Sequence, residues 1–134
     1  MAGYSGTPLV KKLGIAPASR VLVVDAPGGY RARLKGLPEG VEFLTAPSGT
    51  TDLAHAFFTK KSQMAKTLAI LRRKLPPVAV IWVSWPKKSS RVATDITEDT
   101  VREVALPLGL VDIKVCAIDD VWSGLKLVVR KELR

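Results

Sequence analysis

The sequence predicts an α/β fold, with a mostly parallel sheet that is flanked by helices and ends in an antiparallel hairpin. Continuous apolar runs, "VLVV" at 21–24 and "VAVIWVSW" at 78–85, are typical of strands buried on both faces. Segments with helical periodicity separate such runs, as crossover helices do between parallel strands. The last two apolar runs, 109–119 and 122–132, lie too close together for a crossover and predict a hairpin.

The chain has 134 residues, which suit one domain over residues 1–134. Its longest apolar runs are about eight or nine residues long, which is too short to cross a bilayer. The start, "MAGYSGTPLVKKLGI", lacks the apolar core of a signal peptide. We therefore expect a cytoplasmic protein with no membrane contact. The single cysteine excludes an internal disulfide, and with a single histidine in addition a zinc site is not expected.

The first half of the chain alternates short helices and strands. A threonine, a proline and a closing glycine predict a short helix over 7–14, with Thr7 as its N-cap. The first strand leads into a helix over 30–37, which a proline and a glycine end. The runs "VEFLT" (41–45) and "LAHAFFT" (53–59) predict the second and third strands.

The second half contains the longest predicted helix, over 61–75, with Ser62 as its N-cap. Its apolar stripe consists of Met64, Leu68, Leu71 and Leu75. A pair of prolines ends this helix, and the strand at 78–85 follows. Another helix begins at Thr97. Its expected core face consists of Val101, Val104, Ala105 and Leu108.

Ligands of an open parallel sheet lie beyond the carboxyl ends of its strands. This rule selects four loops, at 26–30, 45–50, 59–61 and 85–91. The crossover rule places the loops after strands one, three and four on a common edge. We therefore expect the glycines of the first loop and the cations of the other two to share one functional surface.

The first loop, "APGGY", is similar to the "A-A-P-G-G-aromatic" cofactor loop of RNA methyltransferases of the ribosomal 2′-O and cytosine-5 kinds. The matching residues are Ala26, Pro27, Gly28, Gly29 and Tyr30. Two glycines let the backbone approach a ligand closely, and the following helix offers free N–H groups. The resemblance implies a shortened class I, Rossmann-like methyltransferase fold, with S-adenosylmethionine as the family's cofactor.

Four other features depart from that family's pattern. Those enzymes carry an aspartate within the first strand, where this chain has Leu22, and a small residue where it has Asp25. They end the second strand with an acid that holds the ribose hydroxyls, where this chain has Thr45. Their lysine in the strand before the last helix is absent from "VIWVSW". Neither threonine nor leucine makes the charge-assisted hydrogen bonds of a carboxylate, so we expect no cofactor on what is a degenerate scaffold.

The fourth loop, within "SWPKKSSRVATDITED", is rich in cations and hydroxyls. After Trp85 and Pro86 this stretch contains Lys87, Lys88, Arg91, Ser89, Ser90 and Thr94. Near a helix N-terminus such a set resembles an anion-binding environment. Lys60 and Lys61 follow the third strand and are expected at the same edge. A solvated basic loop is the alternative interpretation.

Several reactive residue types fit structural roles better than catalytic ones. His55 lies within the third strand and is expected to point inward as a hydrogen-bonded core residue. Cys116, in a hairpin strand, is interpreted as core filling. The pair Asp119-Asp120 is typical of a turn. Trp122 is expected at the sheet edge or as a contact between the hairpin and the core.

The whole chain is similar to an uncharacterised bacterial family, domain of unknown function 3052. The resemblance rests on "YSGTPLVKKLGI" at the start, on "WPKK" and "ATDITED", and on "ALPLGLVDIKVCAIDDVWSGLKLVVR" at the end. It covers essentially the full length and implies no particular activity.

The leading hypothesis is a small accessory protein that uses the basic edge to bind an anionic small molecule or protein. The expected ligand-binding residues are Pro27, Gly28, Gly29, Tyr30, Lys60, Trp85, Lys87, Lys88, Ser89, Arg91 and Thr94. One alternative is an S-adenosylmethionine-dependent RNA methyltransferase. Another is a nucleic-acid-binding module without catalysis, which the net charge of +9 permits. Because the charge is dispersed over short pairs, any nucleic-acid binding should be weak and fully salt-sensitive.

Overall fold

The computed structural model describes residues 7–134, which contain a six-stranded sheet with the order β2-β1-β3-β4-β6-β5. The strands are β1 (Arg20–Val24), β2 (Glu42–Leu44), β3 (Leu53–Phe57), β4 (Val80–Pro86), β5 (Leu110–Ala117) and β6 (Trp122–Val129). Strands β2, β1, β3 and β4 pair in parallel, whereas β6 pairs antiparallel with both β4 and β5. The predicted mostly parallel sheet with a C-terminal antiparallel hairpin is confirmed.

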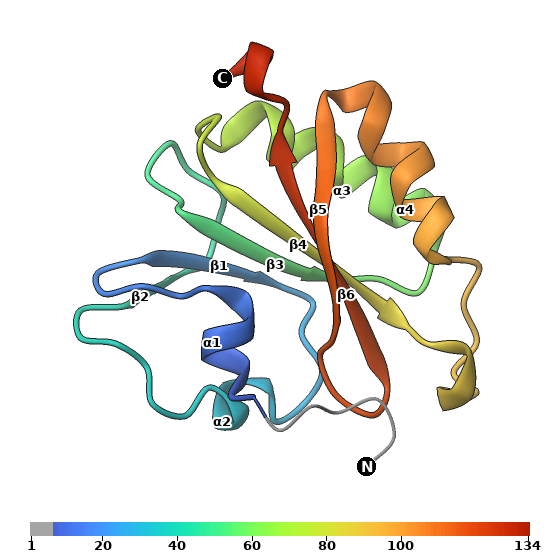
Figure 1. The fold of residues 1–134 in the computed structure, drawn as a ribbon, viewed down its shortest axis with the longest axis horizontal. Helices are drawn as coiled ribbons and strands as arrows, with labels where there is room; N and C mark the ends of the chain where they lie inside the picture. Colours follow the sequence, from blue (N-terminus) through green and yellow to red (C-terminus); the bar gives the residue numbers. More distant parts are fainter. Residues whose placement is uncertain (1–6) are drawn as a thin grey trace.

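Helices cover both faces of the sheet (Figure 1). They are α1 (Leu9–Leu13), α2 (Tyr30–Arg33), α3 (Lys61–Lys74) and α4 (Glu98–Ala105), with the 3-10 turns η1 (Lys88–Ser90), η2 (Leu106–Leu108) and η3 (Lys131–Leu133). Figure 1 shows α1 and α2 on one face and α3 and α4 on the other. None of the helices within residues 7–134 combines the length and the apolar character that crossing a membrane requires.

The central strand β4 serves two hydrophobic clusters because successive side chains point to opposite faces. Ile81 and Val83 pack with the buried residues of α3 and α4. Trp82 packs with the buried residues of α1 and α2. Its indole Nε1 donates a hydrogen bond to the carbonyl oxygen of Leu13 at 3.0 Å, which fastens α1 to the sheet. The continuous apolar run of β4 therefore reflects burial on both sides.

The predicted stripe of α3 is confirmed, since Met64, Leu68, Leu71 and Leu75 are all buried. The predicted cap is wrong. Lys60 occupies the N-cap position of α3, and the backbone N–H of Lys61 donates to Asp95 Oδ1 at 2.7 Å. Asp95 comes from the loop before α4, so a contact between segments distant in the chain takes the place of the local cap expected from Ser62.

Two shorter helices differ from their predicted bounds. Helix α1 has Pro8 rather than Thr7 at its N-cap position, although Gly14 ends it in the left-handed conformation as expected. Helix α2 ends at Arg33 instead of residue 37. The residues beyond it leave helical geometry, because Leu34 has ψ of 59° and Gly36 has φ of +75°.

Helix α4 begins with the capping arrangement that its sequence predicts. Thr97 Oγ1 accepts from the backbone N–H of Thr100 at 3.2 Å, and Thr100 Oγ1 accepts from that of Thr97 at 3.0 Å. Val101 and Ala105 are buried, and Val104 and Leu108 pack beside them, which confirms the predicted core face.

Replacing Thr97 with alanine is expected to lower the free energy of unfolding by about 1 kcal/mol. The backbone N–H of Thr100 loses its acceptor, Thr97 Oγ1, and the reciprocal bond from the Thr97 N–H to Thr100 Oγ1 loses the hydroxyl that Thr100 Oγ1 contacts. Urea denaturation measures this change. Thr97→Ser keeps the hydroxyl and should retain most of the stability. Equal losses in both variants would contradict the capping role.

Candidate ligand-binding site

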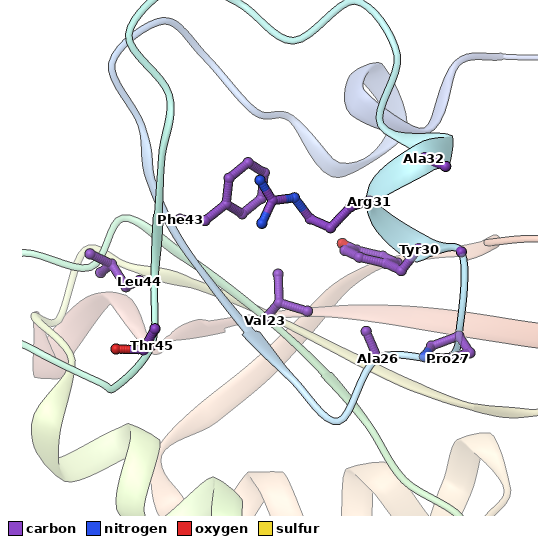
Figure 2. Close-up of a pocket in the computed structure, with 10 residues that line it drawn as sticks. Val23, Ala26, Pro27, Tyr30, Arg31, Ala32, Phe43, Leu44 and Thr45 are labelled. Carbon is purple, nitrogen blue, oxygen red and sulfur yellow. The ribbon is translucent and has the colours of Figure 1, made fainter.

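The carboxyl end of β1 is the topological switch point of the sheet. Strand β1 pairs with β2 on one side and with β3 on the other, so the chain reverses direction across the sheet after β2. Loops that leave such a point diverge and leave a crevice between them. A pocket of about 600 Å³ lies on the β2 side (Figure 2). Its lining consists of Val23, Ala26, Pro27, Gly29, Tyr30, Arg31, Ala32, Phe43, Leu44 and Thr45.

The predicted glycine loop borders this pocket. Pro27, Gly29 and Tyr30 belong to the lining, whereas Gly28 is exposed and lies outside it. Gly29 has φ of +82° and stands at the N-cap of α2, a conformation that most other residues adopt only with strain. The second glycine is therefore required by the turn itself, whether or not a ligand approaches.

Tyr30 points its hydroxyl into the protein and presents only its ring to the pocket. Its Oη lies 2.7 Å from His55 Nδ1, and His55 Nε2 lies 2.7 Å from Ser84 Oγ. All three residues are buried. The prediction of His55 as a hydrogen-bonded core residue is confirmed. Burial lowers the pKa of His55 to about 3, so the imidazole is neutral at physiological pH.

Burial also raises the pKa of the Tyr30 hydroxyl, and the nearby Arg31 charge opposes this effect only in part. The Tyr30 hydroxyl is therefore a neutral member of a structural chain of hydrogen bonds. This chain of hydrogen bonds joins the start of α2 to β3 and β4, and the Tyr30 ring forms part of the pocket wall.

Arg31 is the site residue that sequence reasoning missed. Its guanidinium carbon lies 3.5 Å from the centroid of the Phe43 ring, so the side chain reaches from α2 across to β2 (Figure 2). Among residues 7–134, no carboxylate forms an ion pair with Arg31. A guanidinium stacked on a ring keeps its N–H groups directed outward in its own plane. The one available signal was its place directly after the loop.

The predicted basic loop, which follows β4, does not border the Arg31 pocket. Lys88, Thr94 and the buried Trp85 line a second pocket, of about 270 Å³, together with Glu98 and Ser123. Lys87 is half-buried, and Ser89 and Arg91 are exposed. This pocket shares no lining residue with the first one.

The two predicted parts of the site thus stand apart. Figure 1 shows α2 and the loop after β4 well separated, on opposite sides of the turn between β5 and β6. Lys60, exposed at the N-cap of α3, belongs to the lining of neither pocket. The structure therefore brings the glycine loop together with Arg31 and Phe43, and the lysine loop together with Glu98.

The turn between β5 and β6 has the structural role that its sequence predicts. Asp119 Oδ1 accepts from the backbone N–H groups of Val121 and Trp122, both at 2.8 Å. Asp119 also forms an ion pair with Arg33, which joins this turn to α2. Cys116 is half-buried rather than fully buried, and burial raises the pKa of its thiol against the opposing charges of nearby lysines. A protonated thiol is a poor nucleophile.

No protein-family model and no curated protein sequence matches the chain, so its similarity to domain of unknown function 3052 stays a prediction. Solved structures do match. A SAM-dependent methyltransferase from Aquifex aeolicus is 16% identical, with a TM-score of 0.67 over 90% of this chain and 88% of that one. The fold is methyltransferase-like.

Two further matches agree on the fold. Fibrillarin from Aeropyrum pernix, which holds natively bound S-adenosyl-L-methionine, is 14% identical, with a TM-score of 0.60 over 94% of this chain and 70% of that one. PigF with SAH is 9% identical, with a TM-score of 0.60 over 83% of this chain. The chain spans 56% of the length of PigF. At sequence identities this low, the structural similarity shows the fold and not the function.

Proposed function

We propose that this protein is a small, non-catalytic accessory protein that binds an anionic small molecule in the pocket between β1 and β2. Arg31 supplies the positive charge, and the rings of Tyr30 and Phe43 supply apolar walls. The observation that carries the proposal is the guanidinium of Arg31, which lies 3.5 Å from the Phe43 ring centroid without an acidic partner among residues 7–134.

The charge of the pocket supports an anion. No acidic residue occurs among its described lining residues, and Arg31 is the one formal charge there. Arginine binds phosphate and carboxylate groups through two parallel N–H donors, a geometry that adds both strength and orientation. A volume of about 600 Å³ suits a ligand of nucleotide size.

The same lining fits S-adenosylmethionine poorly. Thr45 stands where the second strand of the resembling methyltransferases ends in an acid, and Leu22 within β1 is a buried core residue. A ribose in this pocket would meet a hydroxyl instead of a carboxylate, and the positively charged sulfonium would lie near a cation rather than an anion. We therefore derive no methyl transfer from this site.

Adenosine 5′-monophosphate serves as a probe that combines a planar ring with an anion. Titration calorimetry should show tighter binding of this nucleotide than of adenosine, because only the nucleotide can pair with the guanidinium. Replacing Arg31 with glutamine should weaken nucleotide binding by about tenfold or more, the equivalent of one lost charge-assisted hydrogen bond. Binding of adenosine should change little.

Two control variants separate charge at the pocket from charge in general. Arg73→Gln removes an exposed arginine at the end of α3 and should leave the affinity unchanged. Lys88→Ala alters only the second pocket and should also have no effect. If Lys88→Ala weakens binding and Arg31→Gln does not, the anion site belongs to the loop after β4 and the Arg31 assignment is wrong.

The same titrations test the alternative functions. A micromolar or tighter dissociation constant for S-adenosylmethionine would favour a methyltransferase and overturn the non-catalytic assignment. RNA binding that is selective for sequence and survives physiological salt would favour a nucleic-acid-binding module, since contacts with phosphates alone weaken steeply as salt rises.

A further inference from the structure

A separate pocket lies on the other side of the switch point, between the ends of β1 and β3. It has a volume of about 260 Å³ and is lined by Asp25, Phe57, Phe58, Thr59, Gln63 and Trp122. It shares no lining residue with the Arg31 pocket. Its formal charge is negative, whereas that of the Arg31 pocket is positive, because Asp25 is the charged residue among these side chains.

Asp25 carries the negative charge of this pocket, and the residue is exposed. Its Oδ2 accepts one long hydrogen bond from Gln63 Nε2, at 3.4 Å, and no ion pair joins Asp25 to a cation within residues 7–134. The backbone of Asp25 has φ of +54°, in the left-handed region that aspartate and asparagine adopt more readily than most other residues.

Two aromatic rings form perpendicular walls beside this carboxylate. The Phe57 and Trp122 ring centroids lie 5.1 Å apart, and their planes meet at 89°. Phe57 is buried and also packs on Tyr30 and His55, which fixes its position from behind. Trp122 is half-buried at the start of β6. The buried Phe57 ring therefore backs the Trp122 ring, which remains accessible from solvent.

We propose that this pocket binds the alkylated ammonium group of a small molecule. The Asp25 carboxylate pairs with the positive charge, and the indole of Trp122, which Phe57 supports from the buried side, attracts the polarised methyl groups by cation–π interaction. A carboxylate combined with an aromatic ring distinguishes such a cation from a neutral group of the same shape. The site is independent of the proposed function, since neither its charge nor its lining involves Arg31.

Tetramethylammonium chloride is the probe for this pocket, with neopentyl alcohol as a neutral compound of similar shape. Titration of ¹⁵N-labelled protein should produce saturable shifts of the Trp122 indole N–H and of the Asp25 and Gln63 amides with the ammonium salt. Replacing Asp25 with asparagine should weaken this binding by about fivefold or more, the order expected for one close charge pair in water. Asparagine tolerates the left-handed backbone, so the variant should fold.

Further variants keep the outcome decisive. Trp122→Leu should also weaken binding of tetramethylammonium, whereas Arg31→Gln should leave it unchanged. Loss of nucleotide binding in Arg31→Gln with intact ammonium binding separates the two sites. Equal affinity for neopentyl alcohol, shifts that do not saturate, or undiminished ammonium binding by Asp25→Asn would each overturn the proposal.

Discussion

Replacing Trp82 with alanine is expected to lower the free energy of unfolding by about 3 to 5 kcal/mol, the range for removing a large aromatic side chain from a packed core. The Trp82 side chain is fully buried, at 0% exposure, in the centre of the sheet. It packs against the α1 and α2 layer and gives its indole N–H to Leu13. The variant therefore loses packing and leaves a buried carbonyl without its donor.

Chemical denaturation measures this loss. One further variant separates packing from the hydrogen bond, and a second is an exposed control. Trp82→Phe keeps most of the apolar volume and removes the hydrogen bond, so it should cost less than alanine does. Val78→Ala removes a side chain that is 78% exposed and should change stability by no more than about 0.5 kcal/mol. A cost below about 1 kcal/mol for Trp82→Ala would contradict the packing of α1 on β4.

Lowering the pH from 6.5 to about 5 is expected to reduce the free energy of unfolding by about 1.5 kcal/mol through His55 alone. The folded pKa of His55 is about 3, below the ordinary value of 6.5, because burial disfavours the charged imidazole. Between these values the unfolded chain binds a proton that the folded chain does not. Stability is thus complete above pH 6.5 and is lost progressively as the pH falls towards 3.

This effect can be assigned to one residue because the sequence contains one histidine. Carboxyl groups of an unfolded chain titrate near about pH 4, so the window above about pH 5 reports on the imidazole. Urea denaturation at several pH values measures the slope. His55→Gln should be less stable at neutral pH and nearly flat across the window. A flat wild-type profile would show that His55 is accessible to protons in the folded protein.

Local patterns predicted most of the secondary structure. The apolar runs of β1 and β4, the stripe of α3 and the capping threonine of α4 are all encoded within a few neighbouring residues, so they could be recognised without knowledge of the fold. The closeness of the last two apolar runs was likewise enough to predict the hairpin of β5 and β6. Helix α2 was predicted too long, because the prediction took Pro38 and Gly40 as the helix end, whereas the chain leaves helical geometry at Leu34 and Gly36 adopts the left-handed conformation.

The candidate site was only partly predictable. The glycine loop and the missing acids at Leu22 and Thr45 could be seen in the sequence, and so could the inward role of His55. The sequence did not reveal that Arg31 pairs with Phe43, because twelve positions separate them in the chain. Nor did it reveal that Asp25 and Trp122 line the same pocket, since 97 positions separate them in the chain.

The sequence by itself determined where strands and helices form, because hydrophobic period and capping act over a few residues. Only the tertiary structure decided which loops adjoin. The strand order places β1 between β2 and β3, and this order sets Arg31 over Phe43 on one side of β1 and Asp25 beside Phe57 on the other. It also separates the lysine loop after β4 from the glycine loop. Pairing between distant strands is fixed by packing of the whole sheet, and no local pattern records it.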